Sequence, residues 1–219
     1  MHSVTDRSDQ HPPGADMIAA SQPPIGPYRR VPVQVYQADP QAPQVARRLI
    51  ALIATRWPRP LAEHVGSSSV AGLAGKGIID LLLPTQPADL PAVTRALVEL
   101  GFQYQDPAVF PVTRPMLWGV FRHGGTDYRV HVHVVAASSP EVAAMRGFRD
   151  ALRADPVLRR RYAALKRAIV AGGPVDPAVF SQAKHDWIAA TLGQLGLTSG
   201  RQRRLYEDDA SLESTRRAS

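Results

Sequence analysis

Cysteine is absent from this chain of 219 residues, which excludes disulfides, thiol catalysis and zinc held by cysteine. No stretch approaches the roughly 20 apolar residues of a membrane span. The N-terminal segment also lacks the apolar core of a signal peptide. We therefore expect a protein that makes no membrane contact and stays in the cytoplasm, whose reducing conditions suit a chain without cysteine.

Apolar periodicity is missing at both ends of the chain. Residues 1–30 are rich in Pro, Ser, Gln and Asp, which predicts a disordered N-terminal tail. Residues 197–219 are polar and basic, which predicts a disordered C-terminal tail. The part between them, residues 31–196, is long enough for one well-filled domain.

The net charge of +7 and a pI near 10.2 invite a nucleic-acid interpretation. Much of this charge lies in the C-terminal tail and in the segment 159–167. Such clusters are more often solvated surfaces than nucleic-acid interfaces, so nucleic acid is the less favoured partner. A nucleotide or another phosphate-bearing small molecule would be attracted by the same positive field.

Residues 61–83 combine two apolar segments with a small-residue turn. A short segment ending at Val65 runs into the turn 66–69, whose backbone N–H groups and hydroxyls are suited to surrounding a phosphate. An apolar run from Ile78 to Leu83 predicts a central strand covered on both faces, interrupted only by Asp80. The ordinary alternative is a tight connection and a carboxylate that pairs at a strand end. Val70 breaks both the Walker A spacing and the nucleophile-elbow spacing.

Residues 117–123 and 128–135 flank Gly124-Gly125-Thr126-Asp127 and predict a hairpin, which makes the sheet mixed. Alternation in the second strand places Arg129, His131 and His133 on one face and its apolar residues on the other. These polar residues form either the solvent-facing side of an amphipathic strand or part of a binding site.

The remaining elements are predicted to be mostly helical. Apolar spacing predicts helices over 41–57 and 88–100, and three more over about 140–154, 156–171 and 176–195. A short edge strand is expected at Val31–Tyr36, because Pro32 disfavours a central position, and an exit turn is expected after Gly101. The C-terminal half is therefore expected to be helical.

Residues 64–80 resemble the GrpB family, whose members carry a His-[Val/Ile]-Gly-Ser-Thr-Ser-Val-Pro-Gly-Leu-x-x-Lys-Pro-[Ile]-Ile-Asp stretch. Ser68, Ala71 and Gly77 depart from this pattern. The helical half is similar to further family signatures around Phe148, Tyr162 and Ala183, and the resemblance covers about 60–192. The positions that match the central stretch are His64, Gly66, Ser67, Ser69, Gly72, Leu73, Lys76, Ile79 and Asp80.

The resemblance implies an α/β (α+β) domain with a nucleotidyltransferase-like small mixed sheet, flanking helices and a helical C-terminal half. The resemblance does not specify a reaction; on this fold our hypothesis is transfer of a nucleotidyl group from an NTP to an unknown acceptor with Mg²⁺ or Mn²⁺. Related domains fused to dephospho-coenzyme A kinases imply a functional link to coenzyme A metabolism.

The implied site residues fall into three groups. Asp80 would hold the metal, and His131 or His133 would position or deprotonate the acceptor. The phosphates would be bound by Gly66, Ser67, Ser69, Lys76, Arg129, Lys166 and Lys184.

The site departs from the superfamily pattern at Leu82, which stands where a second carboxylate is expected. Three interpretations stay open. Asp80 binds one metal, with help from Glu63 or Asp127; or His131, His133 and His64 hold Zn²⁺ or Mn²⁺ for metal-assisted hydrolysis; or the domain is a non-catalytic nucleotide- or RNA-binding module. Because Mg²⁺ prefers oxygen ligands to imidazole, a site built from these histidines would hold Zn²⁺ or Mn²⁺ instead of Mg²⁺.

Overall fold

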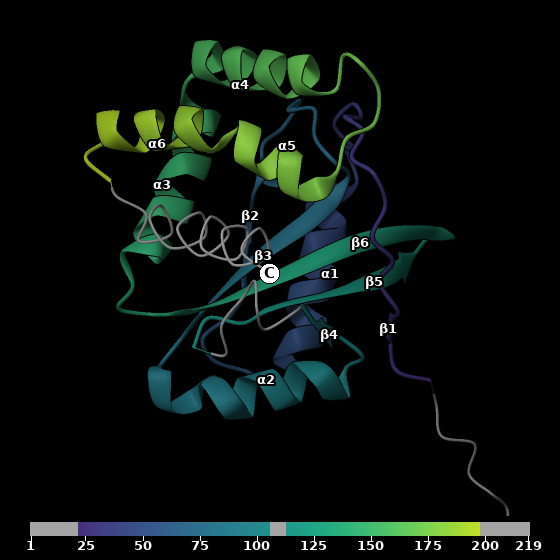
Figure 1. The fold of residues 1–219 in the computed structure, drawn as a ribbon. Helices are drawn as coiled ribbons and strands as arrows, with labels where there is room; N and C mark the ends of the chain where they lie inside the picture. The colour runs from purple at the N-terminus through teal and green to yellow at the C-terminus, as the bar shows by residue number, and fades with distance from the viewer. Residues whose placement is uncertain (1–21, 106–112, 198–219) are drawn as a thin grey trace, which may run out of the picture.

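The computed structural model describes residues 22–105 and 113–197, which form a six-stranded sheet with helices on both faces (Figure 1). The sheet order is β1-β5-β6-β3-β2, and β4 also pairs with β5. Among the described strands only β3 and β6 pair in parallel, so the sheet is mixed as predicted. The strands are β1 (Ile25–Gly26), β2 (Glu63–Val65), β3 (Ile78–Thr85), β4 (Gln103–Tyr104), β5 (Met116–His123) and β6 (Thr126–Ala136).

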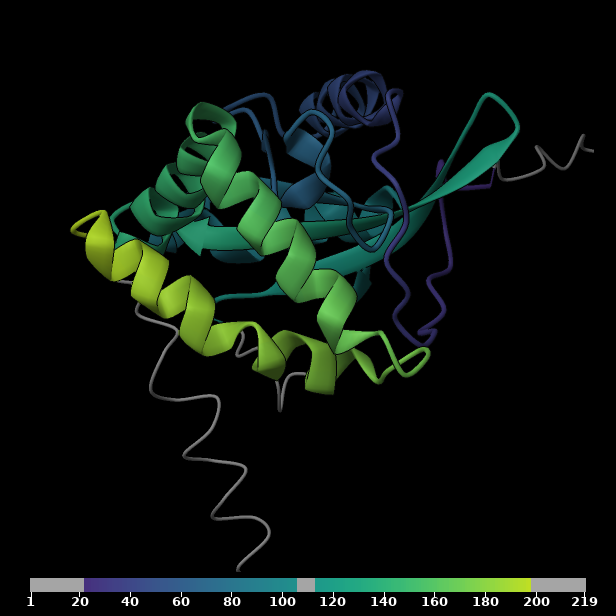
Figure 2. The same cartoon turned by 90° about the horizontal axis from the view of Figure 1, so that it is seen from above.

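The described helices confirm the predicted helical C-terminal half. They are α1 (Ala42–Ala54), α2 (Leu90–Glu99), α3 (Pro140–Ala154), α4 (Pro156–Ile169), α5 (Pro177–Ala183) and α6 (His185–Gln194). Helices α3, α4 and α5 each begin with proline after a capping side chain, Ser139, Asp155 or Asp176. Seen from above, α1 lies on one side of the sheet, and α4 and α5 lie on the other (Figure 2).

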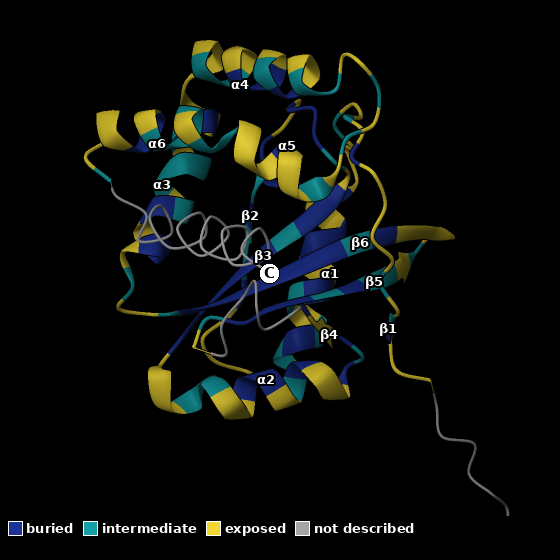
Figure 3. Cartoon of the chain, viewed as in Figure 1, coloured by how far each residue is buried: buried dark blue, intermediate teal, exposed yellow. Residues whose placement is uncertain are grey.

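Strand alternation divides the two central strands into an apolar face and a polar face. Ile79, Leu81 and Leu83 of β3 join three alternate valines of β6 in one core with α1 and α2; these valines are Val130, Val132 and Val134. The opposite face carries Asp80 on β3, and His131 and His133 on β6. Both strands are largely buried along their length (Figure 3). The predicted central strand, covered on both faces, is confirmed.

The helical half is attached over the polar face of the sheet. Phe148, Tyr162 and Trp187 pack together from α3, α4 and α6, with the Tyr162 and Trp187 rings stacked at 5.0 Å. From α3, Arg146 pairs with Glu63 and Arg153 donates to the carbonyl of Ser69. These contacts place the helical half above Asp80 and the two histidines.

Residues 22–30 belong to the fold, which corrects the prediction that residues 1–30 form a tail. Ile25 is 1% exposed, donates its N–H to the carbonyl of Leu100 and, with Gly26, pairs with β5. Gly119 makes room for it, because a Cβ there would lie 2.2 Å from Ile25 Cγ2. A two-residue strand is too short to produce a periodic signal. The remaining tail predictions, for 1–21 and 198–219, lie outside the described residues.

Two smaller predictions are also wrong. The segment Val31–Tyr36 forms no strand and makes only single bridges, from Val33 to Val175 and from Tyr36 to Gly75. The expected exit turn after Gly101 contains β4, which pairs with β5. Both outcomes depend on partners that are distant in the sequence, so local pattern carried no information about them.

No helix in the described part of the chain is both long and apolar enough to cross a membrane.

We predict that Ile25→Ala destabilises the whole domain, because it empties a buried position between the sheet and the end of α2. A buried Ile→Ala change lowers the free energy of unfolding by about 2–5 kcal/mol. Urea denaturation measures the change. Val31→Ala is the matched control, since Val31 is 42% exposed and should change stability by less than about 0.5 kcal/mol. Equal effects of the two substitutions would show that β1 is not part of the cooperative fold.

Candidate functional site

A cavity of about 470 Å³ separates the polar face of the sheet from the helical half. Its size lies in the range of small-molecule sites. The small-residue turn contributes Gly66, Ser67 and Ser68 to its lining. The other predicted site residues that line it are Lys76, Asp80, Arg129, His131, His133, Lys166 and Lys184. The structure therefore brings together every predicted site residue except Ser69.

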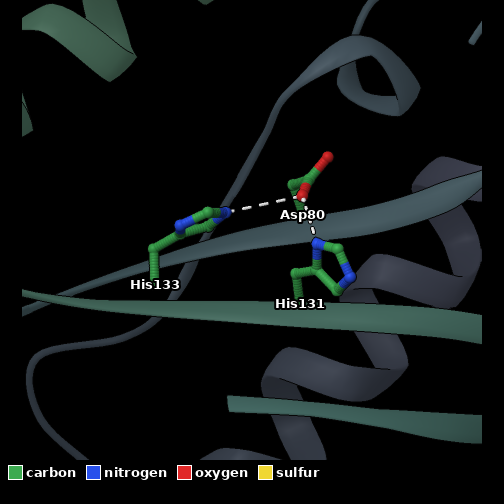
Figure 4. Close-up of side chains that lie close together, drawn as sticks. All are labelled: Asp80, His131 and His133. Carbon is green, nitrogen blue, oxygen red and sulfur yellow. Dashed lines mark hydrogen bonds and ion pairs between the residues drawn. The ribbon is translucent and has the colours of Figure 1, made fainter. Parts of the chain in front are cut away.

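Asp80, His131 and His133 form a compact group (Figure 4), and all three line the cavity from the sheet, which forms its floor. The parallel register pairs Asp80 with His131 and Leu82 with His133, so both imidazoles flank the same carboxylate. His131 Nδ1 and His133 Nε2 each lie 3.5 Å from Asp80 Oδ1. In the described part of the chain, this is the one group of three or more His, Cys, Asp or Glu residues spaced to hold a metal ion.

The electrostatics of this group favour an ionised carboxylate beside a neutral imidazole. Burial raises the pKa of Asp80, but the hydrogen bonds and charges of the two histidines outweigh it and hold that pKa well below its usual range. Burial lowers the pKa of His131, and the attraction of Asp80 offsets this only in part. At neutral pH Asp80 carries a negative charge and His131 offers a nitrogen lone pair.

Gly66 is required at its position by both its backbone and its neighbours. Its φ of 68° and ψ of −171° lie in a region that other residues rarely adopt. A Cβ there would lie 2.5 Å from Asp80 Oδ2. The turn can therefore lie this close to the Asp80 carboxylate only if residue 66 is glycine, which explains why a glycine precedes the serines in residues 64–80.

Ser69 stabilises the turn and does not line the cavity. Its hydroxyl donates to the carbonyl of Gly66 at 2.7 Å, and the residue is 7% exposed. The structure thus does not support the predicted contact of Ser69 with phosphate. Ser68 takes the cavity position, and its hydroxyl meets His64 Nε2 at 3.0 Å.

Lys166 is the most deeply buried cation at the cavity, at 1% exposed. Its ammonium donates to Ser67 Oγ at 2.9 Å and to the carbonyl of Ala74, and it lies 4.5 Å from the centre of the Tyr162 ring. Burial, aided by the positive charges of Arg167 and Lys76, lowers the pKa of Lys166 from its ordinary 10.5 to about 7. An anion in the cavity would favour its charged form.

The other predicted cations surround the same space. Arg129 donates to the carbonyl of Lys76 at 2.7 Å, which ties β6 to the glycine-rich connector. Lys184 and Lys76 lie 4.6 and 5.8 Å from the centre of the Phe180 ring. Arg30 and Asp39 also line the cavity, which therefore combines two carboxylates with five cationic side chains and suits a ligand carrying several negative charges.

The additional metal ligands considered from the sequence are engaged elsewhere. Glu63 pairs with Arg146 and Arg149, and Asp127 pairs with Arg122 at the hairpin end. His64 contacts Ser68 and does not join the histidine group, and burial lowers its pKa to about 4. The interpretations that gave Glu63, Asp127 or His64 a place beside the metal are therefore wrong for this structure.

The residues present do not fit the two-Mg²⁺ arrangement implied by the nucleotidyltransferase resemblance. Leu82, at the second carboxylate position, is fully buried with Val65, Val135 and Val142. The described group offers one carboxylate and two imidazoles, whereas Mg²⁺ sites are built from oxygen ligands.

Tyr28 is a site residue that the sequence did not reveal. Its hydroxyl lies 3.2 Å from His131 Nε2, and its ring stacks on Trp118 at 4.6 Å. Both rings line the cavity. Tyr28 follows a proline in a segment predicted to be disordered, and it reaches His131 only because β1 pairs with β5.

Comparisons with known proteins agree with this fold. Residues 32–194 match the model of the family described as GrpB protein. UPF0157 protein PA4798 of Pseudomonas aeruginosa is 35% identical over 168 residues, which span 74% of this chain and 67% of that protein. UPF0157 protein BH1888 of Halalkalibacterium halodurans is 30% identical over 162 residues, which span 71% of each chain.

Among solved structures, conserved protein GrpB from Enterococcus faecalis superimposes with a TM-score of 0.62 at 21% identity, covering 74% of this chain and 96% of that one. The Cid1 poly(U) polymerase with MgGTP bound matches at a TM-score of 0.43 and 12% identity, covering 68% of this chain and 50% of that one, which is too weak to support an argument about function. The family model covers most of the described residues, and the fold agrees with a solved GrpB structure. The chain belongs to the GrpB family.

Proposed function

We propose that the cavity binds a nucleoside triphosphate and that the protein transfers its nucleotidyl group to an acceptor. The observation that carries the proposal is the gathering of the small-residue turn, five cations and the Asp80 group around one cavity. Ser67 with Lys166 lies beside Asp80 with the two histidines, because Gly66, the residue before Ser67, packs against the Asp80 carboxylate. The family resemblance supplies the nucleotide as the class of ligand.

The phosphates would lie against the end of the cavity that contains Ser67 and Lys166. Lys166 is held there by Ser67 Oγ and the Ala74 carbonyl, so its ammonium needs little reordering to meet an anion. Lys76 and Arg129 extend the positive charge toward Asp80. The α-phosphate would then face the floor of the cavity.

The proposed step is an in-line displacement at the α-phosphorus. An acceptor oxygen forms a bond to this phosphorus, and the bond to the oxygen that bridges the α- and β-phosphates breaks. Pyrophosphate leaves with the electron pair, and the cations at the phosphate end stabilise its charge. The acceptor loses its proton as the new bond forms; His131 or His133 would take it up in the metal-free site, and water would take it up when both imidazoles hold a metal.

Hydrolysis is the second candidate, and the composition of the Asp80 group favours it. Two imidazoles and one carboxylate are the ligands of many hydrolytic metal sites. In that case water replaces the acceptor, and the nucleotide is released as a monophosphate instead of being attached.

The third interpretation, a nucleic-acid-binding module, has less support from the helical half. Arg146 and Arg149 of α3 are paired with Glu63, and Arg153 donates to the carbonyl of Ser69. These arginines attach α3 to the turn and the sheet. Their charges are therefore partly engaged within the fold, although the side chains of Arg146 and Arg153 remain 44% and 46% exposed.

We predict that the purified protein binds an NTP in calorimetry and that Lys166→Met weakens the binding. A hydrogen bond between charged partners contributes about 1.5–3 kcal/mol, so the dissociation constant should rise roughly 10- to 150-fold. Arg160→Met is the matched control, because Arg160 lies exposed on the same helix and its loss removes the same charge. ATP, CTP, GTP and UTP are each titrated with and without a divalent metal. If none of the four binds under any condition, the proposal fails.

The affinity for NTP should fall as pH rises through the pKa of Lys166, which is about 7 in the free protein. The bound anion favours the charged ammonium, so deprotonation above this pH opposes binding, by up to about tenfold per pH unit. Dividing the wild-type affinity by the Lys166→Met affinity at each pH cancels the effect of the nucleotide's own protonation. A ratio that stays constant from about pH 6 to about pH 9 would contradict the role of Lys166.

Reaction with NTP labelled at the α-phosphate separates transfer from hydrolysis. Transfer places the label on an added acceptor, and dephospho-coenzyme A, nucleosides and short RNA represent three acceptor classes. Hydrolysis releases the label as free nucleoside monophosphate. Asp80→Asn should abolish either product while thermal unfolding confirms that the variant is folded. If the protein binds NTP but forms neither product, catalysis on these acceptors is disproved and a binding function remains.

A further inference from the structure

We propose that Asp80, His131 and His133 bind one divalent transition-metal ion, of the kind represented by Zn²⁺, and not Mg²⁺. The two histidines then act as metal ligands, and they are not available as the base that removes the acceptor's proton. The chemistry of this ion rests on the proposed function, but its binding can be measured without nucleotide. The two proposals can therefore fail separately.

The spacing of the three ligand atoms supports a shared ion. His131 Nδ1 and His133 Nε2 approach the same oxygen, Asp80 Oδ1, at 3.5 Å each. This is longer than the roughly 2.9–3.0 Å of a typical N–H···O hydrogen bond. It is close to the separation of about 3.3 Å between ligand atoms in a tetrahedral site with bonds near 2.0–2.1 Å. All three atoms lie within 4.8 Å of one another.

The second observation is a hydrogen-bonding partner at Nε2 of His131, the ring nitrogen that faces away from Asp80. Metal-bound histidines usually engage their other ring nitrogen with a hydrogen-bonding partner, which fixes the ring and the tautomer. Here Nε2 of His131 meets the Tyr28 hydroxyl at 3.2 Å, and the Tyr28 ring is in turn held by stacking on Trp118. The Nδ1 atom is thereby directed toward Asp80.

The ligands themselves discriminate between ions. Imidazole suits Zn²⁺, Fe²⁺, Ni²⁺ and Cu²⁺, whereas Mg²⁺ binds carboxylates, carbonyls and water. Both imidazoles are about nine-tenths buried, and Leu82 closes the position from which a second carboxylate would reach the site. The group contributes a single negative charge, so a bound divalent ion leaves a net positive charge facing the cavity.

Such an ion would supply Lewis-acid polarisation of a phosphoryl oxygen at the floor of the cavity. The chain's own contribution is the geometry around it. Asp80 and the histidines occupy one side, and the cavity leaves the opposite side accessible to a ligand. Gly66 keeps that approach free of a side chain, because any Cβ would collide with Asp80.

The test is a metal titration of the full-length protein after treatment with a chelator, in the absence of nucleotide. ZnCl₂, CoCl₂ and MgCl₂ are titrated separately by calorimetry, and the visible absorption of Co²⁺ reports its coordination independently of any activity. We expect one equivalent of Zn²⁺ to bind at least about 100-fold more tightly than Mg²⁺. His131→Gln and His133→Gln should each weaken Zn²⁺ binding by more than tenfold.

His123→Gln is the matched control, because it removes an imidazole from the same sheet at a position outside the cavity. It should leave Zn²⁺ binding unchanged. Tyr28→Phe keeps the ring and removes only the hydroxyl, and we expect it to weaken Zn²⁺ binding about tenfold while the Co²⁺ spectrum changes. This variant keeps the test valid if a histidine variant does not fold.

Three results would overturn the proposal: Mg²⁺ binding as tightly as Zn²⁺, no specific binding of any of the ions, or Zn²⁺ binding that survives in folded His131→Gln and His133→Gln. The outcome is independent of the nucleotide experiments. Zn²⁺ binding without NTP binding would support the metal site and disprove the nucleotidyltransferase proposal. NTP binding without Zn²⁺ binding would support the nucleotide site and disprove the metal site.

Discussion

The parallel pairing of β3 with β6 is the constraint on which the site depends. Its register places Asp80 level with His131 and leaves His133 one side-chain step further along the same face. A shift by one residue would turn both imidazoles into the apolar core and expose valines to the cavity. That core, with Ile79, Leu81 and Leu83 on the other face of β3, makes such a shift costly. Packing of apolar side chains on one face thus determines the position of the polar group on the other.

The cavity exists because the helical half is attached at its edges and leaves its centre open. Arg146 and Arg153 of α3 hold one edge through Glu63 and the Ser69 carbonyl. Lys166 of α4 reaches the connector through Ser67 and the Ala74 carbonyl. A fully buried ammonium is expensive to keep, because it loses the solvation of water. Its partners in the described structure are neutral groups, and burial is the main cause that lowers its pKa to about 7.

The Asp80 group differs in character from the neighbouring part of the cavity that contains Ser67 and Lys166. The first is one carboxylate with two imidazoles, and the second is a serine hydroxyl held by a lysine ammonium. A site for magnesium alone would require more oxygen ligands, and the buried Leu82 prevents that arrangement. The family fold therefore carries here a ligand set that suits metals which accept imidazole nitrogen. The fold alone does not define the reaction, because function depends on the groups placed on it.

Much of the secondary structure and part of the site followed from local pattern. Alternation in residues 128–135 placed His131 and His133 on one face, and the apolar run interrupted by Asp80 indicated a central strand. The failures came where no local pattern exists. Ser69 has the composition of a phosphate ligand, but its hydroxyl satisfies the Gly66 carbonyl. Tyr28 lies in a segment without periodicity, and its role arises only through pairing of β1 with β5.

The sequence by itself determined the strand alternation, the helices with their proline and capping starts, and the residue types available for chemistry, because these depend on neighbours a few positions apart. Tertiary structure decided which of those residues meet. It joined Asp80 to His131 and His133 across two strands, and it separated His64, Glu63 and Asp127 from them. It also brought Lys166 to Ser67 over 99 positions of chain. Such contacts depend on sheet order and helix packing, which no short stretch of sequence encodes.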